Sequence, residues 1–268
     1  MYRYLVRRIA TVGILVCATA TVAAPIAMES FDYETGTLAG NGSSSDDGWS
    51  GGWTSGSDGD VASPGLEYTD SNSDSLVTAG NKANVVGTSS NKAAFRDLDG
   101  TLTPTAANPI WVSLILESNT SNARFFAFGF MSGGTPVCSI GTDGTSNQNW
   151  RIFAGSTGGG AEVVSGTDAE DQAFLVAKFT DTTADLFVDP NLNAEPTTAD
   201  ASVTFTSIND FDGVRLFAGG ASAPADADFD EIRIGEFYVD VAAIIPEPAT
   251  FALIALGGLA LLTRRSRR

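Results

Sequence analysis

Large and small side chains alternate in the stretch Phe125-Phe126-Ala127-Phe128-Gly129-Phe130, near the middle of the chain. Successive side chains of a β-strand point to opposite faces, so Phe126, Phe128 and Phe130 are expected on one face and small residues on much of the other. In Ile110–Leu116 both faces are apolar except for one serine, which is typical of a central strand buried on both sides. Both stretches therefore predict strands of a β-sheet core.

The same pattern continues through the body of the chain, where short apolar stretches are separated by clusters of Gly, Asn, Asp, Ser and Thr. We count sixteen candidate strands between residues 29 and 241, the last of them Phe237–Val241. Outside the two ends, no window shows the period of an amphipathic helix. Many short strands with polar turns predict an all-β fold of two packed antiparallel sheets.

The closing stretch Phe229-Asp230-Glu231-Ile232-Arg233-Ile234-Gly235 predicts a strand with one apolar face. Ile232 and Ile234 share one face, and Glu231 and Arg233 take the opposite one.

This strand resembles the carboxyl-terminal strand of laminin-G-like, concanavalin A-like jelly rolls. The same resemblance extends to Glu29–Tyr33, Gly48–Trp53, Ala184–Asn193 and Phe211–Gly220. It implies a two-sheet antiparallel jelly-roll sandwich. We therefore expect one jelly-roll domain over residues 25–245.

Residues 1–24 have the composition of a secretory signal peptide. Three arginines precede an apolar stretch, and small side chains follow at Ala18, Ala20, Ala23 and Ala24, as signal peptidase requires. An uncleaved membrane anchor is the alternative, although the apolar stretch is short for a span. The segment predicts an N-terminal signal helix and export of the protein.

The carboxyl-terminal residues 246–268 have three parts in a fixed order. Pro246-Glu247-Pro248 comes first, the uncharged and mostly apolar Ala249–Leu262 second, and an arginine cluster last. The cluster consists of Arg264, Arg265, Arg267 and Arg268. A helix over Ala249–Leu262 would rise only about 21 Å against about 30 Å of hydrocarbon, so arginine snorkelling or local thinning would have to close the gap. Positive-inside bias places the body outside the cytoplasm.

These three parts together resemble the PEP-CTERM sorting signal of Gram-negative bacteria that make extracellular polysaccharide. The resemblance implies recognition by an exosortase, a membrane transpeptidase that cuts near Pro246-Glu247-Pro248. The short transmembrane helix and its arginines would hold the protein in the inner membrane before sorting, and the sorted protein would reach the cell surface or the extracellular matrix. An ordinary tail anchor is the alternative.

The charge and the missing histidines exclude several classes of function. The whole chain has a net charge of −17, and residues 25–245 contain eight basic and 31 acidic side chains, a net charge of −23. Such a surface would repel phosphate backbones, which argues against nucleic-acid binding. The chain has no histidine, so Ser–His–Asp catalysis and imidazole zinc sites are excluded. Of the two cysteines, Cys17 lies in the signal segment, and Cys138 is expected to be a buried, inert thiol.

Asp226, Asp228 and Asp230 are weak candidates for a metal site. Their i, i+2, i+4 spacing puts three carboxylates on one face of a strand, and calcium prefers several hard oxygen ligands. Solvated turn residues are the alternative, because Asp accepts local backbone hydrogen bonds. A catalytic reading is weaker still, since the group contains no glutamate.

Trp49 and Trp53 are weak candidates for ligand binding. They lie in a loop rich in Gly and Ser and could stack on sugar rings, but packing of that loop against the sandwich is the favoured interpretation.

The sequence favours a non-enzymatic, exported protein that binds carbohydrate or matrix, although fold analogy alone carries the last step. A glycan-active enzyme on the same fold and a purely structural surface protein stay open as alternatives. Retaining glycosidases need two carboxyl groups about 5–5.5 Å apart, and the Glu-x-Asp-x-x-Glu pattern of laminarinase-type enzymes is missing from the sequence. We expect signal peptidase, exosortase and extracellular polysaccharide as partners. No catalytic residue is assigned, and calcium is the one cofactor considered.

Overall fold

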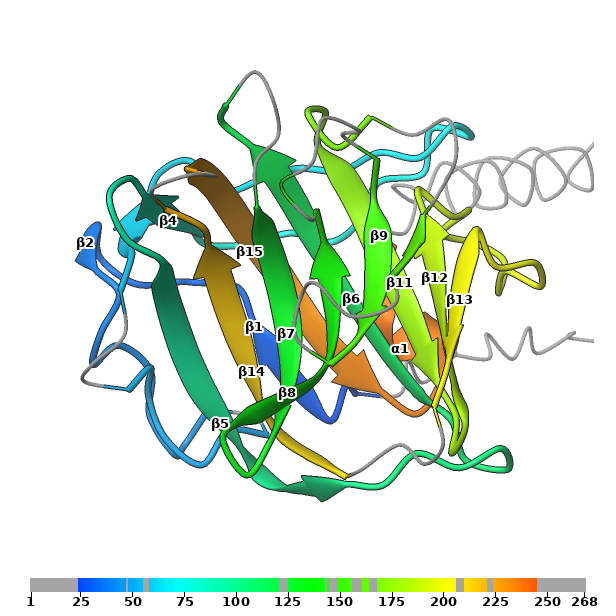
Figure 1. Cartoon of the computed structure of the whole chain (residues 1–268). Coiled ribbons are helices and arrows are strands. Elements are labelled where there is room, and N and C mark those ends of the chain that lie inside the picture. The colour runs from blue at the N-terminus through cyan, green and yellow to red at the C-terminus, as the bar shows by residue number, and fades with distance from the viewer. Residues whose placement is uncertain are drawn as a thin grey trace, which may run out of the picture.

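Short β-strands make up almost all the regular structure of the described residues (Figure 1). The computed structural model describes residues 24–244, apart from 47, 55–57, 121–124, 143, 145–148, 156–160, 164–167, 206–209 and 221–223. The first sheet contains β1 (Ala27–Glu29), β2 (Gly36–Thr37), β3 (Asp60–Ala62), β4 (Lys82–Gly87), β6 (Ile110–Ser118), β11 (Ala173–Phe179), β12 (Thr183–Val188), β13 (Ala201–Thr204) and β15 (Ala225–Gly235). The second contains β5 (Lys92–Leu102), β7 (Phe126–Ser132), β8 (Thr135–Gly141), β9 (Arg151–Ala154), β10 (Ala161–Val163) and β14 (Phe211–Ala218).

The two sheets pack face to face and every strand pair is antiparallel. The order in the first sheet is β13-β12-β11-β6-β15-β4-β3-β2, and β1 pairs with the end of β15 that β4 does not reach. The order in the second sheet is β10-β9-β8-β7-β14-β5. The prediction of an all-β, two-sheet antiparallel sandwich is confirmed, and this arrangement fits a jelly roll.

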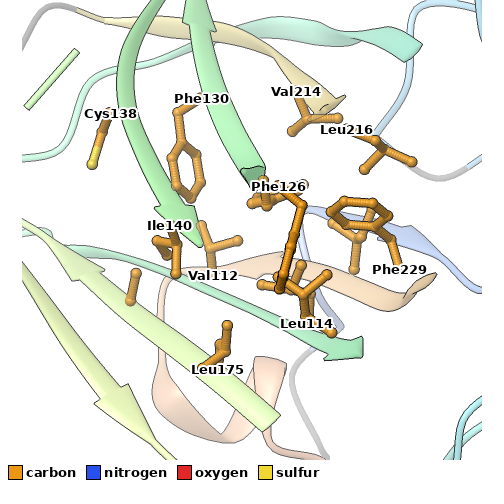
Figure 2. Packing of buried hydrophobic residues seen from close by; sticks show 14 of the residues in the cluster. Val112, Leu114, Phe126, Phe130, Cys138, Ile140, Leu175, Val214, Leu216 and Phe229 are labelled. Carbon is orange, nitrogen blue, oxygen red and sulfur yellow. The ribbon is translucent and has the colours of Figure 1, made fainter. Parts of the chain in front are cut away.

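The main core lies between the sheets, and β7 supplies three phenylalanines to it (Figure 2). Phe126, Phe128 and Phe130 are fully buried, as their alternation predicts. The ring of Phe130 lies 4.5 Å from that of Phe179 on the opposite sheet, measured between centroids. β6 is buried on both faces over most of its length, which confirms its prediction as a central strand. The sulfur-bearing Cys138 of β8 is buried in the same core, and burial raises the pKa of its thiol.

A β-bulge in β15 reverses which residues face the core. Ala227 and Phe229 point inward before the bulge, and Ile232 and Ile234 point inward after it. The extra residue is Glu231, whose φ of 51° is a left-handed conformation that non-glycine residues rarely adopt. The predicted sharing of a face by Ile232 and Ile234 is correct.

A second apolar cluster covers the outer face of the first sheet. Trp111 of β6 is its centre, with ring centroids 5.9 Å from Phe187 and 5.4 Å from Tyr238. The predicted strand Phe237–Val241 is wrong, because Tyr238–Val241 form the one-turn helix α1. The Asp240 carboxylate accepts a hydrogen bond from the Phe237 backbone N–H at 2.9 Å, which stabilises that turn.

The two ends of the chain lie outside the described residues. The expected signal helix over residues 1–24, the domain boundaries and the expected transmembrane helix after Pro246-Glu247-Pro248 therefore stay predictions. Within the part of the chain that the structure describes, no helix is long and apolar enough to cross a membrane.

Candidate functional site

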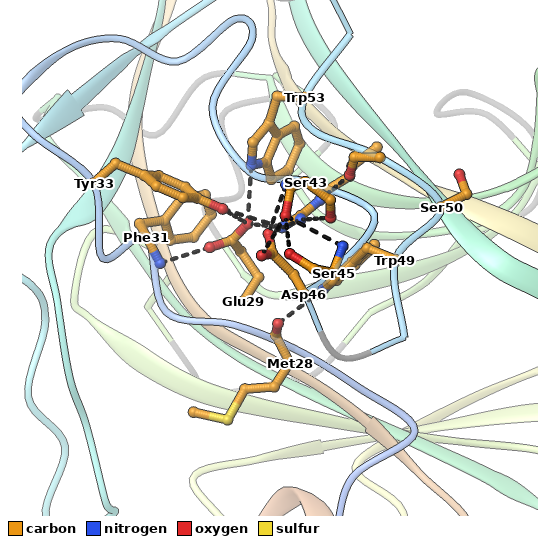
Figure 3. Close-up of polar contacts among 12 residues, drawn as sticks. Met28, Glu29, Phe31, Tyr33, Ser43, Ser45, Asp46, Trp49, Ser50 and Trp53 are labelled. Carbon is orange, nitrogen blue, oxygen red and sulfur yellow. Dashed lines mark hydrogen bonds and ion pairs between the residues drawn. The ribbon is translucent and has the colours of Figure 1, made fainter.

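An ion pair between Arg96 and Glu29 lies inside the sandwich and connects the two sheets. Figure 3 shows Glu29 beside Tyr33 and Trp53. Arg96 occupies an inward position of β5, between Ala94 and Leu98. Glu29 comes from β1 of the other sheet. The two side chains are 1% and 3% exposed, so their charges are removed from water and must be compensated within the protein.

All five N–H donors of Arg96 have acceptors. The Nε–H group donates to the Gly51 carbonyl at 2.9 Å. Nη1 donates to Glu29 and to the Tyr33 hydroxyl, the second at 3.2 Å. Nη2 donates to the Asp46 carboxylate at 2.5 Å and to the backbone carbonyl of Ser43. The guanidinium therefore binds the loop of residues 38–59 to β1 and has no donor left for an anionic ligand.

Glu29 is equally saturated. Its carboxylate accepts hydrogen bonds from the Phe31 backbone at 2.7 Å, the Tyr33 hydroxyl at 2.8 Å and the Trp53 indole at 3.0 Å, in addition to Arg96. Burial raises the pKa of Glu29, and the Arg96 charge and these hydrogen bonds oppose the rise. These partners hold the carboxylate in place.

Trp49 and Trp53 belong to this cluster and are not available to sugars. They are 0% and 1% exposed, as the packing interpretation expects. The Trp49 indole donates to the Met28 carbonyl at 2.8 Å and lies under the Arg96 guanidinium, 4.6 Å from ring centroid to Cζ. The preceding Gly48 has a φ of 81°, and a Cβ there would lie 2.0 Å from the backbone oxygen of Ile26, so only glycine fits.

A hollow of about 290 Å³ opens beside the ion pair. Glu29, Asp32 and Asp46 line it together with Arg96 and Tyr33. Of these three carboxylates, Glu29 and Asp46 are separated by Arg96, which donates to both. The arrangement is that of a clamp for the first loop.

The structure does not bring Asp226, Asp228 and Asp230 together around an ion. The Asn84 amide lies between the first two and donates to them at 2.7 and 2.8 Å, and Lys82 forms an ion pair with Asp228 at 2.6 Å. Asp230 is fully buried and accepts backbone hydrogen bonds. No group of three acidic, cysteine or histidine side chains that could hold a metal occurs among the described residues.

The outer face of the second sheet has small residues at its centre. Strand register places five outward-facing residues side by side across β5, β14, β7, β8 and β9: Phe95, Arg215, Gly129, Ser139 and Phe153. The next row contains Ala93, Phe217, Ala127, Gly141 and Arg151. The face of β7 opposite its phenylalanines therefore has the small side chains that the sequence predicts. Larger side chains lie on the strands to either side of this small centre.

Two basic side chains lie in these rows, Arg215 and Arg151. The Cζ of Arg215 lies 4.7 Å from the centroid of the Phe217 ring, and its Nε lies over Gly129, where a Cβ would be 3.5 Å away. The Nε is buried and has no hydrogen-bond acceptor. Partial burial lowers the pKa of the guanidinium. Arg215 takes part in none of the ion pairs found among the described residues. The basic residues that do are Lys82, Lys92, Arg96, Lys178 and Arg233.

Neither Arg96 nor Arg215 can be identified as a site residue from the sequence. Alternation around the large apolar Phe95 would place Phe95 inward and Arg96 outward, the reverse of what the structure has. Arg215 faces outward and looks like an ordinary surface residue until its missing acceptor is seen.

The carboxyl-terminal residues provide the clearest link to known proteins. The family model described as the PEP-CTERM protein-sorting motif matches residues 245–268. The chain carries a PEP-CTERM motif. The match contains Pro246-Glu247-Pro248 and the terminal arginines, as expected from the sequence. It supports an exported protein that is recognised by an exosortase and sorted to the cell surface.

The chain also has distant likenesses among solved structures. The globular domain of T. cruzi calreticulin matches with a TM-score of 0.47 at 11% identity, over 91% of this chain and 100% of that one. An endo-1,3-beta-glucanase from Streptomyces sioyaensis matches with a TM-score of 0.43 at 13% identity, over 81% and 97%. A sialidase matches with a TM-score of 0.41 at 10% identity; 63% of this chain is covered, and the chain spans 16% of the sialidase. No curated protein matches the chain. Likenesses this distant carry no argument about activity.

Proposed function

We propose that this PEP-CTERM protein is a non-enzymatic surface protein whose laminin-G-like, concanavalin A-like sandwich binds neutral polysaccharide. The observation that carries the proposal is Arg215, a partly buried guanidinium with an unpaired Nε on the outer face of the second sheet. Leaving a buried donor unpaired costs about 1–3 kcal/mol, more when the group is charged. A ligand that supplies an acceptor at this point would recover that free energy.

The surroundings of Arg215 suit a sugar. Phe95 and Phe125 are partly exposed near it, and the rings of Phe125 and Phe217 lie 4.7 Å apart between centroids. Sugar rings offer apolar C–H faces to phenyl rings, and their hydroxyl and ring oxygens accept hydrogen bonds from a guanidinium. The net charge of −23 over residues 25–245 would repel a polyanion, which favours a neutral chain.

The same geometry argues against cleavage of the ligand. In the hollow beside Arg96, Glu29 is saturated by hydrogen bonds and Asp46 accepts from Arg96. Asp226 and Asp228 are bridged by Asn84. Neither group offers an acid and a nucleophile that face a common space, which a glycosidase needs.

We expect Arg215→Ala to weaken binding of the body to a soluble neutral glycan by about 10- to 100-fold, the effect of losing a hydrogen bond to a charged donor. Affinity gel electrophoresis with a β-1,3-glucan, a xylan and a dextran measures it, and alginate serves as the acidic comparison. Lys92→Ala, which removes an exposed ion pair with Asp58, is the matched control and should bind as the wild type does. Arg215→Lys should be intermediate.

Three outcomes would contradict the proposal. Unchanged affinity of Arg215→Ala would remove the proposed site, and failure of the wild type to bind any of the glycans would favour a purely structural role. Release of reducing ends from a bound glycan would show the glycan-active enzyme that we propose against.

A further inference from the structure

The two most exposed large apolar side chains of the described residues lie together beside α1. Phe237 is 59% exposed and Val239 is 51% exposed. Both line a hollow of about 460 Å³, together with Leu192, Ala243 and Ile244. We call Phe237, Val239 and this hollow the α1 surface. Soluble domains usually keep such side chains scattered, so their concentration at one point indicates a contact.

The position of the α1 surface in the chain indicates what it contacts. Ile244 lines the hollow, and only residues 245–248 separate it from the apolar segment Ala249–Leu262. A fully extended chain spans at most about 3.4 Å per residue, so the start of the apolar segment lies within about 17 Å of Ile244. If that segment inserts in a membrane, the α1 surface cannot be farther than this from the edge of the hydrocarbon. The headgroup layer itself is about 5–7 Å thick on each side.

The charges around the α1 surface indicate which lipid headgroups it can contact. Glu236 is exposed next to Phe237, and no lysine or arginine lines the hollow. Glu195 also lines the hollow, where its carboxylate pairs with Lys178 at 3.1 Å. Acidic side chains would be repelled by anionic lipids, whereas zwitterionic headgroups carry no net charge. A second copy of the chain is a poorer occupant, because stable interfaces need about 20–30 residues on each side.

We propose that the α1 surface rests on the zwitterionic lipid surface of the membrane while the carboxyl-terminal segment is inserted. Phe237 and Val239 then lie in the headgroup layer and fix the orientation of the sandwich. Pro246-Glu247-Pro248 is confined to the gap between α1 and the hydrocarbon, where every copy presents it in the same way. The inference rests on the membrane handling that the sorting motif supports, and it adds the face of the body that meets the lipid.

A tryptophan in the α1 surface tests this in the full chain reconstituted in phosphatidylcholine vesicles. The natural tryptophans Trp49, Trp53, Trp111 and Trp150 are 2% exposed or less, so they give a constant background. We expect brominated phosphatidylcholine to quench the added fluorescence of Phe237→Trp at least several-fold more than that of Val86→Trp. Val86 is 39% exposed and pairs with Asp226, nine residues along β15 from Gly235, or about 30 Å.

The possible results distinguish a failure of the α1 contact from a failure of membrane anchoring. Equal quenching of the two tryptophans in protein that floats with the vesicles would overturn the α1 contact and leave sorting and glycan binding untouched. Protein that does not float with the vesicles would overturn the contact together with membrane anchoring. Shielding of Phe237→Trp from acrylamide in the absence of lipid would show that the chain itself, or a second copy, covers the surface, which also contradicts the proposal.

Discussion

Replacing Arg96 with leucine is expected to lower the free energy of unfolding of the sandwich by about 3–5 kcal/mol, because it leaves a buried carboxylate without its counter-charge. Glu29 would stay 3% exposed and lose its ion pair, and the loop of residues 38–59 would lose the guanidinium that binds Gly51 and Asp46. Domains of this kind are stable by about 5–15 kcal/mol, so the variant should unfold at a clearly lower urea concentration.

Two further variants make this result specific. Lys92→Ala breaks an ion pair on the same strand whose partners are 40% and 36% exposed, and should cost less than about 1 kcal/mol. Glu29→Met combined with Arg96→Met removes both buried charges, so it should be more stable than the Arg96 single variant. A loss below about 1 kcal/mol for Arg96→Leu would show that the clamp contributes little to stability.

The stability of the sandwich should fall between about pH 4 and pH 8, and Asp230→Asn should make that fall smaller. Burial raises the pKa of Asp230 from 3.8 to about 8, and the nearby Glu231 carboxylate adds to the rise. Between these two values the folded state binds a proton that the unfolded state has released, so the free energy of unfolding decreases as the pH rises and levels off above about pH 8. At 1.36 kcal/mol per pKa unit, the decrease from this group is at most about 6 kcal/mol.

Urea titrations at several pH values measure the slope for both proteins. Other groups also contribute to it, since burial raises the pKa of Glu29 and of Glu231 and since the acidic surface repels itself more as it ionises. Asp97→Asn is therefore the matched control. Asp97 is exposed, so this variant removes one negative charge without changing the β-bulge in β15 that follows Asp230. Parallel slopes for the wild type and Asp230→Asn would mean that Asp230 is ionised in the fold throughout this range.

Periodicity in the sequence was sufficient for the fold class and for the strands that form the core. The alternation at Phe126, Phe128 and Phe130 and the apolar run of β6 describe side-chain faces directly, because a strand repeats every two residues. The helical turn α1 was missed because one turn is too short to show a period and because its stability comes from Asp240 and from packing on Trp111.

The polar contacts could not be read from the sequence in the same way. Glu29 and Arg96 are 67 positions apart, and only the pairing of β1 with β15 and the packing of the two sheets bring them together. The spacing of Asp226, Asp228 and Asp230 correctly put them on one strand, but the partner strand β4 supplied Asn84 and Lys82, which occupy the place of an ion. Spacing within one strand cannot show what the neighbouring strand offers.

Mass spectrometry of the mature carboxyl terminus, in cells that contain an exosortase, tests the central claim most directly. The PEP-CTERM motif at residues 245–268 predicts that the mature protein lacks Arg264–Arg268, and that deleting the exosortase leaves a membrane-bound form with the tail intact. Two prolines in Pro246-Glu247-Pro248 keep that segment extended and accessible to an enzyme in the same membrane. Mature protein that retains the arginine tail in every copy would show an ordinary anchor and contradict the account.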